Sequence, residues 1–375
     1  MLKGRELAIF RKQLLRWFRQ FQRDLPWRRT KDPYRIWLSE IMLQQTRVAA
    51  AIPYYERFLQ RFPDVHSLAS APQEEVLRLW SGLGYYSRAR NLQEAAQQIV
   101  AKHSGEFPTR LEDVLALPGV GDYTAAAIFS IAFGEKLAVL DGNVARVLVR
   151  LGAIRGDLRE SRRWQELQKT ADRLLEQKSP GDWNQAMMEL GATLCAPKSP
   201  RCVLCPAAQF CEGRKLGIAE SLPEKRKKRA TVEVTLAAAV FADKNGHTLL
   251  LPPPKNTEEK ASANHVPTLV SRMSHFPTVA VEGEPAEDLI AFLRRMFPGS
   301  QGRKWQIVRA GKVRHAVTYR AITLLPFLIE VRELPRIAGA KQVPLGDVSS
   351  LPVSNLTRKA ARAALEAQGS APAKR

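Results

Sequence analysis

The chain has 375 residues, of which 45% are hydrophobic and 25% are charged. This globular composition excludes a disordered or fibrous protein. A single core stops growing at about 250–300 residues, so we expect two domains. Lysine and arginine number 58 against 37 acidic residues, which leaves a net charge of +21. Such an excess of positive charge predicts a polyanionic partner, either nucleic acid or an anionic membrane surface.

Hydropathy argues against a membrane-spanning or exported chain. No apolar run approaches the roughly 20 residues that a transmembrane helix needs. The N-terminal residues 1–10 also lack the apolar centre of a signal peptide. We therefore predict no membrane association and a cytoplasmic, nucleoid-associated location.

Residues 1–220 show the periodicity of successive helices. Apolar residues recur at spacings of three and four, as in Leu7, Phe10 and Leu14, and prolines punctuate the segments between them. The pattern predicts an all-α domain.

The pattern of the sequence changes after residue 220. Residues 221–232 are basic and aperiodic, which indicates an exposed linker, and residues 233–358 are strand-rich, which predicts a smaller α+β domain. An alanine-, lysine- and arginine-rich tail, residues 359–375, is expected to be frayed. The expected strands are 231–241, 247–251, 279–281, 305–309 and 321–331, with one helix over 284–297.

A glycine-rich turn lies between two helical patterns at residues 117–121, which read LPGVG. Gly119 and Gly121 permit a tight hairpin whose backbone N–H groups can meet a phosphate at the start of the next helix. This is the helix-hairpin-helix pattern, which clamps the DNA backbone without reading its sequence. An ordinary glycine-rich helix turn is the alternative.

Two carboxylates stand out by their surroundings. Asp141 immediately precedes a new helix, so it is either an N-cap or a carboxylate held ionised near a developing cation. Glu40 lies in a largely apolar segment, where it is either a paired structural residue or an acid with a raised pKa. Gln44 and Gln45 follow closely, and their amides can enter a base stack or face water.

All four cysteines fall within a short segment with the spacing C-x6-C-x2-C-x5-C. Such a cluster favours a metal site over disulfides, and four thiolates would fill every metal position, so the site is structural. The spacing alone leaves zinc and a [4Fe–4S] cluster open. The candidate ligands are Cys195, Cys202, Cys205 and Cys211.

Together these features resemble the helix-hairpin-helix DNA glycosylases that carry an iron–sulfur loop, and most closely the adenine DNA glycosylases of the MutY type. The resemblance covers roughly residues 10–215. The segments that carry it are LPWR (25–28), DPYRIWLSEIMLQQTRV (32–48), GLGYYSRARNL (82–92), LPGVGDYTAAAI (117–128), LDGNVARVL (140–148) and WNQAMMELGATLC (183–195).

The resemblance implies a different catalytic role for each of the two carboxyl groups. Glu40 would protonate N7 of adenine, and Asp141 would stabilise the sugar cation electrostatically or capture it covalently. Bifunctional relatives carry a nucleophilic lysine where this chain has Tyr123, and a phenol cannot form a Schiff base. We therefore expect excision without strand cleavage, with Tyr123 hydrogen-bonded within the site.

The resemblance also assigns the substrate and the residues that contact it. The expected substrate is double-stranded DNA with adenine opposite 8-oxoguanine or guanine, bound by a monomer. Adenine must leave the base stack to react, and Gln45 and Tyr85 would fill the gap. The residues expected to bind DNA or the extruded base are Trp27, Arg28, Gln44, Gln45, Thr46, Tyr85, Gly119, Gly121, Asn143, Glu189, Thr318 and Tyr319.

For the remaining parts, the resemblance favours a [4Fe–4S] cluster at the cysteines and a Nudix-like C-terminal domain that reads the lesion. The catalytic glutamate cluster of Nudix hydrolases is absent. Residues 317–319 read VTY where the family has Phe-Ser-His, so Thr318 keeps a hydroxyl and Tyr319 replaces the imidazole. Two alternatives stand beside the glycosylase: a non-catalytic lesion-binding protein, and an endonuclease III-like glycosylase/lyase.

Overall fold

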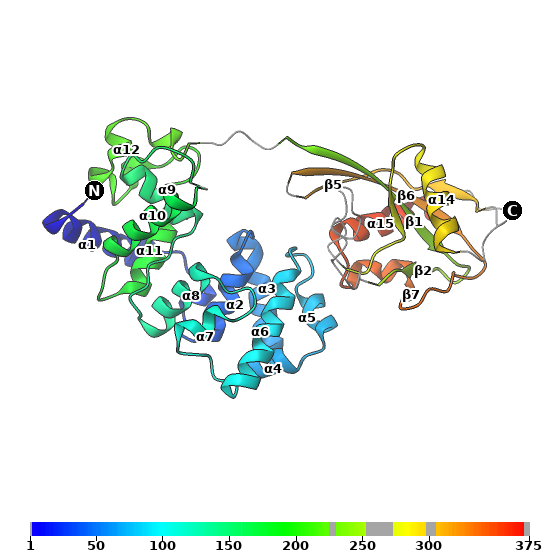
Figure 1. Cartoon of the computed structure of the whole chain (residues 1–375), viewed down its shortest axis with the longest axis horizontal. Helices are drawn as coiled ribbons and strands as arrows, with labels where there is room; N and C mark the ends of the chain where they lie inside the picture. Colours follow the sequence, from blue (N-terminus) through cyan, green and yellow to red (C-terminus); the bar gives the residue numbers. More distant parts are fainter. Residues whose placement is uncertain are drawn as a thin grey trace. The chain divides into compact units, whose positions relative to one another are not determined.

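The computed structural model describes residues 2–158, 160–224, 230–252, 273–297, 305–317 and 319–370. The chain forms two compact units (Figure 1). The first comprises Met1–Gln73 and Ser87–Lys227, and the second comprises Glu74–Tyr86 and Lys228–Arg375. No helix in the described ranges is long and apolar enough to cross a membrane.

The first unit is helical, as predicted, and its described residues contain no strand. Short 3-10 turns, among them η1 (Pro26–Arg28), connect several of its helices. The helices are α1 (Gly4–Phe21), α2 (Pro33–Leu43), α3 (Val48–Arg61), α4 (Val65–Ser70), α6 (Ser87–His103), α7 (Leu111–Leu115), α8 (Asp122–Ile128), α9 (Gly142–Leu151), α10 (Ser161–Leu174), α11 (Pro180–Thr193) and α12 (Glu212–Lys215).

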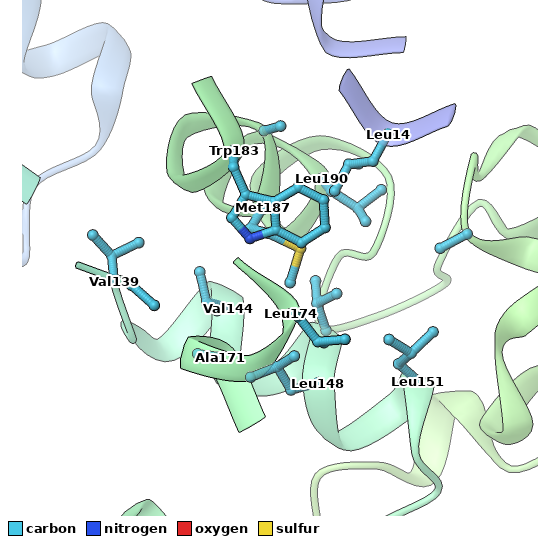
Figure 2. Packing of buried hydrophobic residues seen from close by; sticks show 14 of the residues in the cluster. Leu14, Val139, Val144, Leu148, Leu151, Ala171, Leu174, Trp183, Met187 and Leu190 are labelled. Carbon is cyan, nitrogen blue, oxygen red and sulfur yellow. The ribbon is translucent and has the colours of Figure 1, made fainter. Parts of the chain in front are cut away.

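Helix α9 runs through the centre of the hydrophobic core. Helices α10, α11 and α12 pack against it, and Trp183 and Met187 of α11 belong to the same buried cluster as Leu148 of α9 (Figure 2). Every residue of α9 from Val144 to Leu151 is buried. Because the helix is held on all sides, the position of its N-terminal residue Asp141 is fixed by the core.

The predicted hairpin joins α7 to α8. The N–H of Val120 donates to the Leu117 carbonyl at 3.1 Å, which closes the turn. Gly119 has φ of +78°, and a Cβ there would lie 3.0 Å from Cβ of Asn91. Glycine is required at this position both by its backbone conformation and by the close approach of the neighbouring helix α6.

The second unit contains a mixed sheet in the order β3-β1-β6-β4, with β5 also pairing with β6. The long strands β1 and β6 are parallel, from Val232 opposite Arg320 to Ala242 opposite Glu330. A separate antiparallel pair is formed by β2 and β7. The strands are β1 (Val232–Ala242), β2 (His247–Leu250), β3 (Thr278–Ala280), β4 (Ile307–Arg309), β5 (Val313–Val317), β6 (Arg320–Glu330) and β7 (Lys341–Pro344).

Each face of this sheet buries its own core. Alternate residues of β1 point to opposite faces, so Leu236, Ala238 and Val240 belong to one cluster and their neighbours to the other. Helix α15 (Asn355–Ser370) covers the first face and α14 (Pro285–Met296) the second. Burial on both faces explains why β1 reads as a continuous apolar run. The sequence did not predict β5 and β7.

Three expectations about domain limits need correction. The tail expected at 359–375 is part of α15 as far as Ser370, and Ala360, Ala361 and Ala364 are fully buried against the sheet. The linker expected from residue 221 begins later, because Leu222 is buried in the helical core. It also ends earlier, since β1 starts at Val232. Residues 225–229 and 371–375 lie outside the described ranges.

Candidate active site

A cavity of about 660 Å³ opens in the helical unit between η1, α2, α8, α9 and α11. Both predicted carboxylates and Tyr123 line it, although they come from three separate segments of the sequence. The predicted residues that the structure brings together here are Trp27, Arg28, Glu40, Gln44, Gln45, Thr46, Tyr123, Asp141, Asn143 and Glu189.

Glu40 is the buried acid of this cavity. Glu40 lies on α2, whose N-terminus is capped by the Asp32 side chain, which accepts the N–H of Tyr34. Glu40 is only 6% exposed. Burial raises the pKa of Glu40 to about 7; the charge of Asp141 adds to this, and the Tyr123 hydrogen bond and Arg28 oppose it. A carboxyl group with this pKa is substantially protonated at neutral pH, as a general acid requires.

Asp141 is the N-cap of α9. Its side chain accepts the Val144 N–H at 2.7 Å and the amide of Asn143 at 2.9 Å. Burial raises the pKa of Asp141, while these hydrogen bonds and the charge of Arg146 act in the opposite direction. Asp141 therefore accepts hydrogen bonds from several donors that favour its carboxylate form. The main hydrogen-bond donor to Glu40 is the phenol of Tyr123.

Tyr123 lies in the first turn of α8, directly after the hairpin. Its hydroxyl donates to Oε2 of Glu40 at 2.7 Å and also contacts the Met188 sulfur at 3.2 Å. Burial and the two nearby carboxylates raise the pKa of Tyr123 well above its usual value. The phenol therefore stays protonated and remains a hydrogen-bond donor.

Glu189, on α11, also lines the cavity. Its carboxylate accepts from Arg23 and Arg28, with a distance of 2.7 Å to each guanidinium. Burial disfavours its charge, but the hydrogen bonds from the two arginines outweigh burial and lower its pKa. Arg28 and Glu189 were predicted from the sequence but Arg23 was not, because no local pattern shows that residues 23 and 189 meet.

Arg146 was also missed. It is 9% exposed, and its guanidinium donates to Asn143 Oδ1 at 2.9 Å and to the Cys195 carbonyl at 2.9 Å. Since Asn143 in turn donates to Asp141, hydrogen bonds run without a break from the cysteine segment to the carboxylate. The sequence signal for it was weak: Arg146 and Arg150 lie one helical turn apart and interrupt the apolar residues of α9.

The four cysteines lie apart from this cavity and line a small one of about 30 Å³. Its lining contains sulfur donors but no aspartate, glutamate or histidine, and the Arg150 guanidinium contacts the Cys195 sulfur at 3.3 Å. Within the described ranges, no group of three or more histidine, cysteine, aspartate or glutamate residues is arranged to hold a metal ion.

Among the described residues, four of those expected to contact DNA do not line the active-site cavity. Gly119 and Gly121 form the hairpin. Tyr85, with φ of +48° and 48% exposed, belongs to the second unit. Tyr319 also belongs to the second unit, where the Arg320 guanidinium lies 5.0 Å from its ring centroid. Thr318 lies outside the described residues.

The helical unit combines a helix-hairpin-helix with a cavity that holds a buried acid and an N-cap aspartate, and its sequence matches a known superfamily. Residues 38–176 match the family described as "HhH-GPD superfamily base excision DNA repair protein". A thermostable thymine-DNA glycosylase of known structure is 30% identical, with a TM-score of 0.51; the match covers 97% of that protein and 56% of this chain.

Curated relatives narrow the assignment within that superfamily. Adenine DNA glycosylase of Buchnera aphidicola (subsp. Schizaphis graminum) is 37% identical over 259 residues, which cover 69% of this chain and 74% of that protein. The human adenine DNA glycosylase is 49% identical over 218 residues, 56% of this chain. The chain belongs to the adenine DNA glycosylase family. The match spans 40% of the human protein's length.

Proposed function

We propose that this protein hydrolyses the N-glycosidic bond of adenine in double-stranded DNA, opposite 8-oxoguanine or guanine, and leaves an abasic site. The observation that carries the proposal is Glu40, a buried acid with a pKa of about 7 that shares its cavity with the N-cap carboxylate of Asp141. Two carboxyl groups in different environments are what acid-assisted glycoside hydrolysis needs.

The mechanism assigns one step to each group. Extruded adenine enters the cavity, and protonated Glu40 donates its proton to N7, which makes the base a better leaving group. The bond to the sugar then breaks, and Asp141 stabilises the resulting cation by its charge or by covalent capture. Water completes the hydrolysis, with the Glu40 carboxylate placed to accept its proton. Tyr123 holds Glu40 in position throughout.

Strand cleavage is not part of the proposed reaction. A lyase needs an amine to form a Schiff base with the sugar. No lysine lines the cavity in the described part of the chain, and a phenol, Tyr123, stands two residues after the last hairpin glycine, Gly121. The product is therefore an intact abasic strand.

The second unit is the proposed reader of the opposite base. Its mixed sheet with a helix on either face supports the Nudix-like assignment. The assignment of Thr318 and Tyr319 to lesion contact rests on the resemblance of residues 317–319 to the family's Phe-Ser-His segment, and Tyr319 directly precedes β6. The net charge of +21 supports a DNA partner and a location at the nucleoid.

We further propose that the four cysteines hold a [4Fe–4S] cluster. The cavity lining, with four cysteines and no carboxylate or histidine, suits either zinc or an iron–sulfur cluster, and the resemblance to the iron–sulfur DNA glycosylases favours the cluster. The bound cluster would supply charge and shape to its loop. Hydrolysis itself needs only Glu40, Asp141 and water.

The test uses a duplex with one adenine opposite 8-oxoguanine, assayed with and without alkali. We expect a strand break only after alkali, and none with Glu40→Gln. Breakage without alkali would show a lyase and overturn the assignment of Tyr123. Tight binding without breakage in either case would replace the proposal with a lesion-binding protein. Gel filtration of the same sample tests the expected monomer.

A further inference from the structure

Residues 44–46 form a turn at the end of α2 that projects residues into the active-site cavity. Gln44, Gln45 and Thr46 all line this cavity together with Glu40, which lies one helical turn earlier. Gln45 has φ of +56°, a left-handed conformation that glutamine rarely adopts. Such a conformation persists only where surrounding contacts hold it.

The contacts come from Arg88, at the start of α6. Its Nη1 donates to the carbonyls of Ile41 at 2.8 Å, Met42 at 2.9 Å and Gln44 at 2.6 Å. Its Nη2 donates to Oγ1 of Thr46 at 3.2 Å. One guanidinium thus binds both sides of Gln45 in the chain.

The physical chemistry of a helix end explains why an arginine suits this place. The last four carbonyls of a helix have no partner within it, and the helix dipole places negative charge there. Arg88 is 9% exposed, so it brings a buried positive charge to these carbonyls. Its planar fork reaches several acceptors at once, which a lysine cannot do.

We propose that Arg88 is a positioning residue that holds Gln45 in its left-handed conformation, so that the turn can occupy the gap left by the extruded base. This inference rests on the proposed function and deepens it, because it assigns base extrusion to a residue that does not line the cavity. Arg88 acts through the turn and leaves the acid chemistry at Glu40 unchanged.

The test compares Arg88→Met, which keeps the apolar stem but removes every donor, with Arg88→Lys, which keeps the charge. We expect Arg88→Met to slow single-turnover excision about 100-fold, the loss that a small misplacement can cause. Arg88→Lys should recover part of that loss. The basic limb of the pH–rate profile should not move, because none of the groups that set the pKa of Glu40 is changed.

Base extrusion is measured directly with 2-aminopurine in place of the target adenine, since its fluorescence rises when it leaves the stack. The experiment is done in the Glu40→Gln background to prevent excision. Adding Arg88→Met should abolish the fluorescence rise. The matched control is Gln93→Leu, also on α6, which removes a buried hydrogen bond of 2.6 Å to the Ala71 carbonyl and should leave the rise intact.

The inference is overturned if Arg88→Met gives the parental fluorescence rise, if Gln93→Leu loses it equally, or if the pH limb moves. Failure of the proposed function is a separate result. If the parent protein excises no adenine, the fluorescence comparison still reports whether Arg88 controls extrusion.

Discussion

The Tyr123→Phe variant tests the electrostatic reasoning about Glu40 most directly. It removes one hydroxyl, and with it the 2.7 Å hydrogen bond to Oε2 that stabilises the Glu40 carboxylate. The other causes of the pKa shift, burial and Asp141, remain. The pKa of Glu40 should therefore rise further.

The size of the rise follows from the hydrogen bond. A bond to a charged group contributes about 1.5–3 kcal/mol, and 1.36 kcal/mol corresponds to one pKa unit. Since the hydroxyl also contacts Met188, we take the lower end. The pKa of Glu40 should move from about 7 by roughly one unit, to about 8.

The assay is the pH dependence of kcat/KM for excision, which reports ionisation in the free enzyme. Glu40 must be protonated to act as an acid, so activity falls as the pH rises through its pKa. The falling limb should lie near pH 7 in the parent protein, since the pKa of Glu40 is about 7, and at higher pH in Tyr123→Phe. A limb that stays in place or moves to lower pH would refute the reasoning.

Three further predictions concern stability and DNA binding. Because the pKa of Glu40 is raised by folding, the free energy of unfolding falls as the pH rises from about 4.5 to about 7. Gln carries no charge at any pH, so Glu40→Gln should have a higher urea midpoint than the parent at pH 8 but not at pH 4. Equal midpoints at pH 8 would contradict this. Glu189→Gln removes the charge that pairs with both Arg23 and Arg28, and it should lower the free energy of unfolding, measured in urea, by about 3 kcal/mol. A loss of under about 1 kcal/mol would count against a buried ion pair. Gly119→Ala forces alanine into a left-handed conformation that costs about 1–2 kcal/mol, and it should weaken binding to undamaged duplex DNA. An unchanged affinity would show that the hairpin does not contact DNA.

The sequence was informative wherever a function depends on neighbours in the chain. The hairpin glycines, the N-cap Asp141 and the cysteine spacing are local patterns, and each of the first two has the predicted local structure. The long strands β1 and β6 were also predicted, because burial on both faces leaves a continuous apolar run.

Expectations failed where packing against a distant segment decides the outcome. The C-terminal tail was expected to fray because alanine gives little hydrophobic signal. Small side chains instead allow α15 to approach the sheet closely, and Ala360 and Ala361 become fully buried. Strands β5 (VRHAV) and β7 (KQVP) were missed because each is short and its apolar residues are interrupted by basic or amide side chains. For β7, the partner strand β2 also lies far away in the sequence.

The sequence by itself determined which residues can do the chemistry, since Glu40, Tyr123 and Asp141 occupy positions within local motifs. Only the tertiary structure decided that they share one cavity and that Arg23, Arg88 and Arg146 support it. Each of these arginines forms hydrogen bonds to residues more than 40 positions away in the chain. A buried guanidinium is defined by the carbonyls and carboxylates that surround it, and those become neighbours only when the chain folds.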